Sequence, residues 1–70
     1  MENQELRNQI KVQRAIKSIT QEELASEIGV TRKTINTIEN GKFVPSTILA
    51  IRLAHFFEIP VEELFELIDI

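Results

Sequence analysis

The sequence predicts an all-α fold, and three observations support this prediction. Strand signals are missing, because no run of alternating β-branched and polar residues is flanked by hairpin turns. The 70 residues include only two glycines and two prolines, the residues that most often mark turns. Breaks at 17–20, 29–31, 40–46 and 59–61 leave five short segments that can be helical. We therefore expect a compact five-helix bundle, and 70 residues are enough for a single domain.

The first helical segment precedes the break that begins at Lys17. At helical spacing Leu6 and Ile10 lie on one face, whereas Val12 and Ile16 form a second apolar patch. One face is expected to pack in the core, and the other needs a partner or a fold-back of the chain.

The second segment opens with a capping box at Thr20 and Glu23. We expect the Thr20 hydroxyl to accept from the Glu23 amide, and the Glu23 side chain to accept from the Thr20 amide. Gly29 supplies the left-handed backbone position that ends this helix. Its inward residues are Leu24, Ala25 and Ile28.

Thr31 and Ser46 are the expected N-caps of the third and fourth segments. The third segment turns Ile35 and Ile38 inward and ends at Asn40-Gly41. The fourth, from Thr47 to Glu58, is apolar around most of its circumference and is expected to be the central core helix. The last runs from Val61 to about Leu67, with apolar residues at helical spacing.

Residues 21–40 have the spacing of a helix-turn-helix, with two short helices and a tight turn. Ala25 is small where the helices touch, and Gly29 is flexible in the turn. Ile35 and Ile38 lock the second helix across the first and leave its opposite face free. In this arrangement the second helix enters the DNA major groove.

The stretch QEELASEIGVTRKTINTIENGKFVPS resembles the Xre family of short DNA-binding proteins, which includes the phage Cro and cI repressors. The similarity extends over residues 8–65. The residues in family register are Arg14, Gln21, Leu24-Ala25, Gly29, Ile35, Ile38-Glu39-Asn40-Gly41, Pro45 and Val61-Glu62-Glu63-Leu64-Phe65. The resemblance implies a lambda-repressor-like domain over residues 1–70 that binds double-stranded DNA.

The resemblance also implies roles on the recognition helix. Arg32 and Lys33 would read base edges at its exposed start, since arginine can bridge guanine O6 and N7. Asn36 could pair with adenine N6 and N7, and a methyl of Thr31 or Thr37 could touch thymine.

Contacts to the DNA backbone are expected on both sides of the recognition helix. Gln21 resembles the family's phosphate contact at the start of the preceding helix. Asn40 and Lys42, with Thr34, resemble further backbone contacts.

The family pattern also pairs Arg14 with Glu39 in an internal ion pair between the first and third helices. The chain departs from the family pattern at Gln13, often leucine, and at Ser18, often a turn-favouring residue such as glycine. Both departures concern only how the first helix packs.

A homodimer is expected, because one recognition helix sees only about four base pairs, too few to select a site among a million or more. The C-terminal residues 61–70 are the expected interface, through Leu64, Leu67, Ile68 and Ile70. Half-sites would then lie about 34 Å apart on one face of the duplex.

Several classes of function lack the residues that they need. The chain has one histidine, one aspartate and no cysteine, so we expect no enzymatic activity, metal or cofactor. From 70 residues we also expect no separate small-molecule effector domain. The N-terminus is acidic and polar rather than a secretory signal, and no membrane span is present. We therefore expect a cytoplasmic protein.

The sequence predicts a sequence-specific transcriptional regulator, most simply a repressor that binds a palindromic operator. An antitoxin-like or adaptor module remains an alternative, with the C-terminus or the patch of Val12 and Ile16 as its protein-binding surface. A catalytic domain remains a distant third, since 70 residues can hardly enclose a pocket.

The net charge of −3 argues at first against DNA as a partner. Its distribution removes the objection, since residues 1–42 carry seven Lys/Arg and six Asp/Glu, and residues 43–70 carry one and five. The acidity is therefore expected away from the DNA face.

Overall fold

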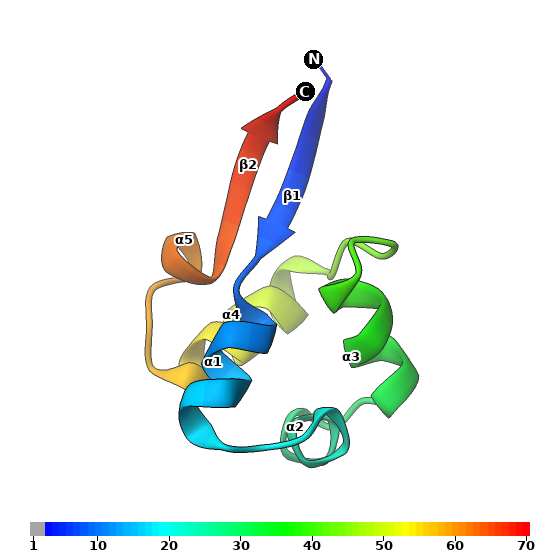
Figure 1. The fold of residues 1–70 in the computed structure, drawn as a ribbon, viewed down its shortest axis with the longest axis vertical. Helices are drawn as coiled ribbons and strands as arrows, with labels where there is room; N and C mark the ends of the chain where they lie inside the picture. The colour runs from blue at the N-terminus through cyan, green and yellow to red at the C-terminus, as the bar shows by residue number, and fades with distance from the viewer. Residues whose placement is uncertain (1–2) are drawn as a thin grey trace.

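The computed structural model describes residues 3–70, which form a body of five helices with a two-stranded ribbon. The helices are α1 (Ile10–Lys17), α2 (Gln21–Ile28), α3 (Arg32–Glu39), α4 (Thr47–Phe57) and α5 (Val61–Leu64). The strands are β1 (Gln4–Asn8) and β2 (Phe65–Asp69). Both strands extend away from the helical body, and Gln4 and Asp69 pair near the far tip of the ribbon (Figure 1).

The ribbon corrects the all-α prediction, which placed Leu6 in the first helix and residues 65–67 in the last one. The two strands are antiparallel, and Leu6 lies opposite Leu67. Helix α5 ends at Leu64 because the next residue, Phe65, takes extended backbone angles, with φ −125° and ψ 140°. Each strand pairs with residues near the other end of the chain, so the sequence contains no local hairpin signal that would predict the ribbon.

The core lies between the helices and includes the inward residues expected of α2 and α3. Six large side chains are almost completely buried: Ile10, Leu24, Ile35, Ile38, Leu53 and Leu64. On α4, Leu53, Ala54 and Phe57 are buried, whereas Ile48 and Ile51 are exposed. The apolar circumference of α4 is therefore only partly covered by the rest of the chain.

The predicted helix boundaries around the turn are confirmed by the hydrogen bonds of their caps. The Thr20 hydroxyl accepts from the Glu23 amide at 3.0 Å, and the Glu23 carboxylate accepts from the Thr20 amide at 2.8 Å. Thr31 and Ser46 cap α3 and α4 in the same way through their hydroxyls. Gly29 has φ +88°, the left-handed conformation expected at the end of α2. These caps fix the angle at which α3 leaves α2.

The ribbon is joined to the helical body at its base. The Asn8 side chain donates to the Ile38 carbonyl at 3.0 Å and accepts from the Ile10 amide at 3.1 Å. The Gln9 amide donates to the Leu64 carbonyl at 2.9 Å. The start of α1, the end of α3 and the end of α5 are thus tied to one point.

No helix within residues 3–70 has both the length and the apolar character needed to cross a membrane.

Candidate nucleic-acid interface

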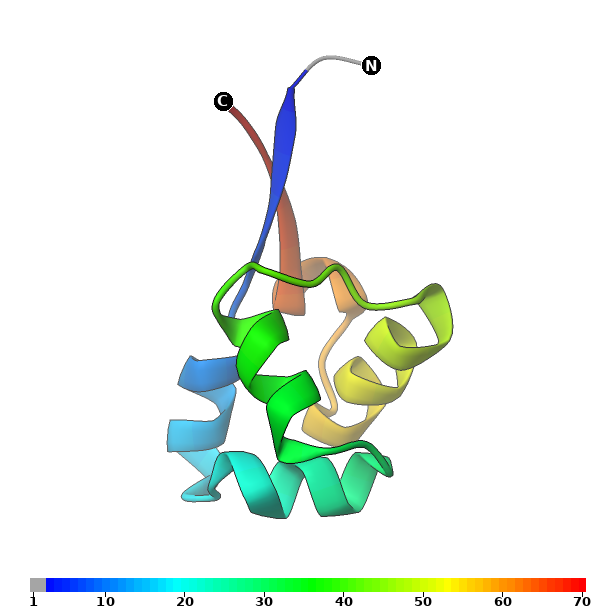
Figure 2. The ribbon, with the colours of Figure 1, turned by 90° about the vertical axis from the view of Figure 1, so that its right-hand side faces the viewer.

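Helix α3 lies on the outside of the body, where one of its faces is open to solvent. In Figure 2 it stands at the front, and α2 crosses its lower end. Ile35 and Ile38 hold its inner face in the core. On the same helix Arg32, Lys33 and Asn36 remain exposed. The pair α2 and α3 therefore has the geometry of a helix-turn-helix with a free recognition helix.

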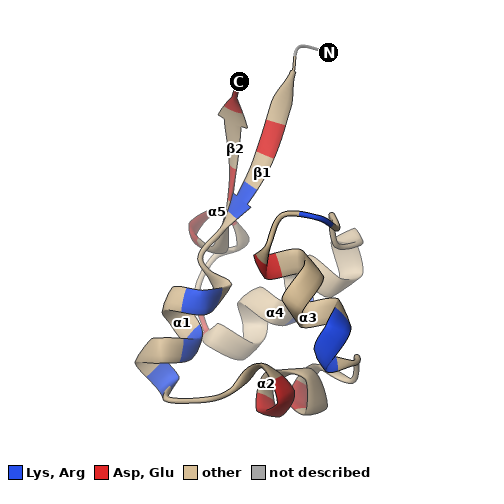
Figure 3. Cartoon of the chain, turned by 45° about the vertical axis from the view of Figure 1, so that its right-hand side comes forward, with Lys and Arg blue, Asp and Glu red and all other residues tan. Residues whose placement is uncertain are grey.

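The positive charges of this face form no ion pair within residues 3–70. Two ion pairs form among residues 3–70, Arg7 with Glu5 and Arg14 with Glu39. Arg32 and Lys33 belong to neither pair, and both are exposed at the start of α3. Figure 3 shows basic residues there and in the loop after α3, and acidic residues on the ribbon, on α5 and on α2, where Glu22 and Glu23 lie in the first turn. The open face of α3 is thus suited to an anionic partner.

Three threonines surround this basic end of α3. The Thr31 hydroxyl accepts from the Thr34 amide at 3.2 Å and lies 3.1 Å from the Thr34 hydroxyl. The Thr37 hydroxyl donates to the Thr34 carbonyl at 3.0 Å. These bonds fix the orientation of the three hydroxyls on α3 and leave acceptor lone pairs on them.

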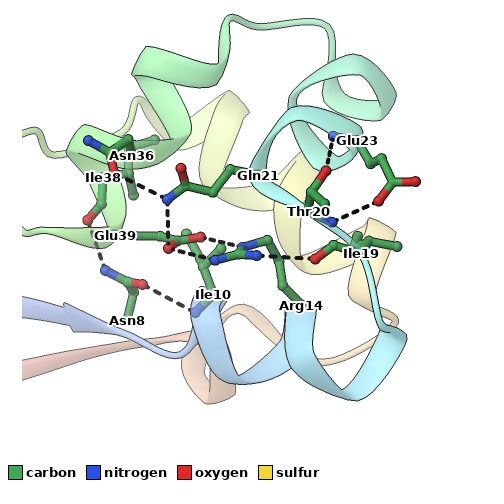
Figure 4. Close-up of polar contacts among 10 residues, drawn as sticks. All are labelled: Asn8, Ile10, Arg14, Ile19, Thr20, Gln21, Glu23, Asn36, Ile38 and Glu39. Atoms are coloured by element: carbon green, nitrogen blue, oxygen red, sulfur yellow. Dashed lines mark hydrogen bonds and ion pairs between the residues drawn. The ribbon is translucent and has the colours of Figure 1, made fainter.

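Arg14 and Glu39 form the ion pair that the resemblance implied, between α1 and α3 (Figure 4). Arg14 Nε donates to Glu39 Oε2 at 2.7 Å, and its Nη2 donates to Oε1 at 3.1 Å. Arg14 Nη1 donates to the Ile19 carbonyl at 3.1 Å. The hydrogen bond with Glu39 raises the pKa of Arg14 above its ordinary value, although burial acts in the opposite direction. Glu39, the carboxylate of α3, is therefore turned away from the open face.

The Gln21 side chain is also engaged with α3. Its Nε2 donates to Glu39 Oε1 at 3.1 Å and to Asn36 Oδ1 at 3.2 Å. An amide nitrogen has two hydrogens, so both are used within the chain. The side-chain N–H groups of Gln21 are therefore not free for the expected phosphate contact, which stays a prediction; the backbone N–H of Gln21 lies in the first turn of α2.

The loop after α3 returns toward the recognition helix. Gly41 has φ +74°, and the Lys42 amide donates to the Thr37 carbonyl at 2.9 Å. Asn40 and Lys42, both expected backbone contacts, are exposed beside it. A shallow hollow of about 340 Å³ is lined by Lys33, Thr34, Thr37, Lys42 and Phe43.

Phe43 is a residue of this hollow to which the sequence reasoning gave no role. Nearly half of its side chain is exposed, next to two lysines. An aromatic residue directly after Lys42, in a loop that follows a recognition helix, was the available signal.

The expected dimer residues differ in their access to solvent. Leu64 is 0% exposed in the core, so it cannot contact a second chain, and this part of the expectation is wrong. Ile68 is half-buried, whereas Leu67 and Ile70 are 62% and 73% exposed.

A second exposed apolar surface, at the start of α4, was missed by the sequence reasoning. We call it the α4 surface; it comprises Ile48 and Ile51, three residues apart on α4, together with Val44 in the loop before the helix, and Ile48 is 72% exposed. The sequence signal for this surface was that apolar residues cover most of the circumference of α4, which led to the expectation of a central core helix.

Metal-binding clusters are absent from residues 3–70, where no three His, Cys, Asp or Glu side chains lie close enough to hold an ion. His55, the one histidine, is exposed on α4.

Fold and site together define a helix-turn-helix protein with an outward recognition helix. A model of the family described as helix-turn-helix matches residues 10–64. The chain belongs to this family, in its Xre-like form.

Curated relatives agree with this assignment. The chain is 45% identical over 60 residues to an HTH-type transcriptional regulator of Methanocaldococcus jannaschii, with 86% of this chain and 91% of the relative covered. It is 39% identical over 60 residues to the HTH-type transcriptional regulator YgzD of Bacillus subtilis, with the same coverage. The chain is therefore placed among the DNA-binding helix-turn-helix transcriptional regulators.

Two solved structures share the fold. One is a protein from Bacteroides fragilis described as DNA-binding, with a TM-score of 0.77, 28% identity, and coverage of 87% of this chain and 98% of that one. The other is the restriction-modification controller protein C.AhdI from Aeromonas hydrophila, with a TM-score of 0.72, 27% identity, and coverage of 79% and 80%.

Proposed function

We propose that this chain is a sequence-specific repressor that binds a palindromic operator as a homodimer and occludes a promoter. The observation that carries the proposal is the open face of α3, where Arg32 and Lys33 are exposed and have no ion-pair partner among residues 3–70. Arginine and lysine at the start of a recognition helix can bond guanine O6 and N7 in the major groove. Base contacts of this kind specify a sequence.

The charge distribution supports one orientation on the duplex. The ribbon and α5 carry five carboxylates, Glu5, Glu62, Glu63, Glu66 and Asp69, against the single cation Arg7. Phosphates repel that end of the molecule and attract the start of α3 and its following loop. DNA therefore approaches the helical body opposite the acidic end.

Homodimer formation supplies the second half-site, since one α3 reads only about four base pairs. The two apolar surfaces differ in charge. Strands β1 and β2 carry three acidic residues and one basic residue, so a second copy on the ribbon would bring like charges together. Helix α4 carries no acidic residue. We therefore place the dimer contact at the α4 surface rather than at Leu67 and Ile70.

The experiment that tests the function is selection of bound duplexes from random DNA at two salt concentrations. The expected result is a palindromic consensus whose half-sites are one helical turn apart, about 10 base pairs. Arg32→Ala should relax the consensus, whereas Lys11→Ala, which removes the same charge from α1, should preserve it. If the unmodified protein enriched no sequence at either salt concentration, specific repression would be abandoned.

A protein-binding role, as in an antitoxin-like or adaptor module, is the second candidate. The observation in its favour is that Val12 and Ile16 are both exposed. They belong to α1, a different helix from the recognition helix α3 and from α4. A stable heteromer with the product of an adjacent gene, lost in a Val12→Ser/Ile16→Ser variant that still binds DNA, would support it. An unchanged heteromer would remove it.

A further inference from the structure

The polar network beneath α3 fixes the direction of an exposed amide. Its first member is Glu39, whose ionised carboxylate can only accept hydrogen bonds. Two of its donors come from Arg14, and a third is Gln21 Nε2 at 3.1 Å from Oε1. The nitrogen of the Gln21 amide must face Glu39, because the amide oxygen would be repelled by the carboxylate. The buried ion pair therefore determines the orientation of Gln21.

Gln21 in turn determines the orientation of Asn36. The same Nε2 lies 3.2 Å from Asn36 Oδ1, and a donor nitrogen must meet an acceptor. Oxygen and nitrogen of an amide are usually assigned from the surrounding hydrogen bonds. Here the Glu39 carboxylate, the first group in this series of hydrogen bonds, allows only one assignment of the Asn36 amide. Oδ1 of Asn36 faces α2, and its Nδ2 points the other way (Figure 4).

The outward nitrogen of Asn36 is free to donate. It has no hydrogen-bond partner among residues 3–70, and Asn36 is exposed on the open face of α3. Its neighbours Arg32 and Lys33 also carry only donors. Arg32, Lys33 and the outward side of the Asn36 amide thus present only donors on this face.

We propose that Asn36 reads the acceptor edge of a purine, N7 together with O6 where the base is guanine, and that Gln21 and Glu39 act as positioning residues that hold its Nδ2 toward the base. This inference rests on the proposed function. It differs from the sequence expectation of a two-bond pair with adenine, which requires Oδ1 to meet the 6-amino group of the base. In this structure Oδ1 is engaged by Gln21.

The experiment uses the selected operator and measures dissociation constants. Asn36→Ala first identifies the base pair whose preference disappears. At that pair a 7-deaza purine, which lacks the N7 acceptor, should weaken binding of the unmodified protein about tenfold and leave Asn36→Ala unaffected. With adenine placed at that pair, removal of its 6-amino group should have little effect. An equal loss from that removal, or no loss with the 7-deaza base, would overturn the inference.

Two further variants test the positioning role by base preference. Asn36→Asp still accepts from Gln21 but presents an acceptor outward, so the preference should move to a base with an amino group, such as cytosine. Gln21→Met frees the Asn36 amide to rotate, so the 6-amino group of adenine should now contribute to binding. Unchanged preference in a folded Gln21→Met variant refutes the positioning role, and Gln21→Ala, which also removes the Nε2 donor, repeats this test if Gln21→Met fails to fold. Failure of the unmodified protein to select any sequence would instead refute the proposed function.

Discussion

Arg14 and Glu39 join α1 to the recognition helix through two hydrogen bonds, of 2.7 and 3.1 Å, at a site largely shielded from solvent. Their side chains are 15% and 6% exposed. The same carboxylate receives the Gln21 amide, so one ion pair both connects the two helices and directs the side chains beneath the DNA face. The ion pair and the Gln21 amide beneath α3 therefore depend on a common carboxylate.

Removal of Arg14 should destabilise the fold strongly. In Arg14→Met the Glu39 carboxylate stays nearly buried without its cation, a situation that costs about 3 kcal/mol of unfolding free energy. Urea denaturation followed by circular dichroism measures the loss. Arg7→Met is the matched control, because the Arg7–Glu5 pair is exposed and is worth less than about 1 kcal/mol. Equal losses in the two variants would show that burial of the Arg14 pair has no energetic consequence.

Ser18→Gly should stabilise the protein. Ser18 ends α1 with φ 56°, a left-handed conformation that costs a non-glycine residue about 1 kcal/mol. The family pattern favours a turn-forming residue here, and the structure supplies the reason. The opposite change, Gly29→Ala, should destabilise by a similar amount at φ +88°, although a Cβ there would meet Arg52 Nη2 only at an ordinary 3.5 Å. Thermal unfolding of both variants checks the two signs, and a loss of stability in Ser18→Gly would contradict the argument.

The helices could be predicted from the sequence because their signals are local. Thr20 and Glu23 are three residues apart, and the hydrogen bonds that start α2 need nothing beyond that segment. The ribbon could not be predicted in this way. Gln4 pairs with Asp69, 65 residues later in the sequence. The spacing of the leucines in the two segments fits a helix as well as a strand, and only the pairing of these distant segments selects the strand.

The candidate site was predictable as a set of residues but not as a set of oriented groups. Arg32 and Lys33 are exposed because Ile35 and Ile38 must face inward, which periodicity alone shows. The direction of the Asn36 amide depends on a carboxylate that also bonds α1, and this is a tertiary property. Similarly, the sequence pattern predicts that Ile48 is a core residue, whereas in the structure the other helices do not cover it.

Lys42→Ala should weaken DNA binding uniformly rather than change the consensus. Lys42 is exposed in the loop after α3 and lines the hollow beside Lys33, where a phosphate can approach. Loss of one phosphate contact lowers the slope of log K against log salt by about 1. Fluorescence anisotropy at several salt concentrations measures this slope. A changed base preference with an unchanged slope would instead assign Lys42 to base reading.

Ile48→Glu should convert the dimer to a monomer. Its side chain is 72% exposed at the centre of the α4 surface, and in a two-fold dimer the same surface of each copy meets its equivalent. Two carboxylates would then be brought together out of water, which costs several kcal/mol and separates the copies. Leu67→Glu is the matched control, with 62% exposure on the already acidic ribbon, and it should remain dimeric. Light scattering at micromolar concentration gives the mass of each variant. A monomeric Leu67→Glu beside a dimeric Ile48→Glu would move the interface to the ribbon, and the spacing of the two α3 helices on DNA would have to be derived from that end of the molecule instead.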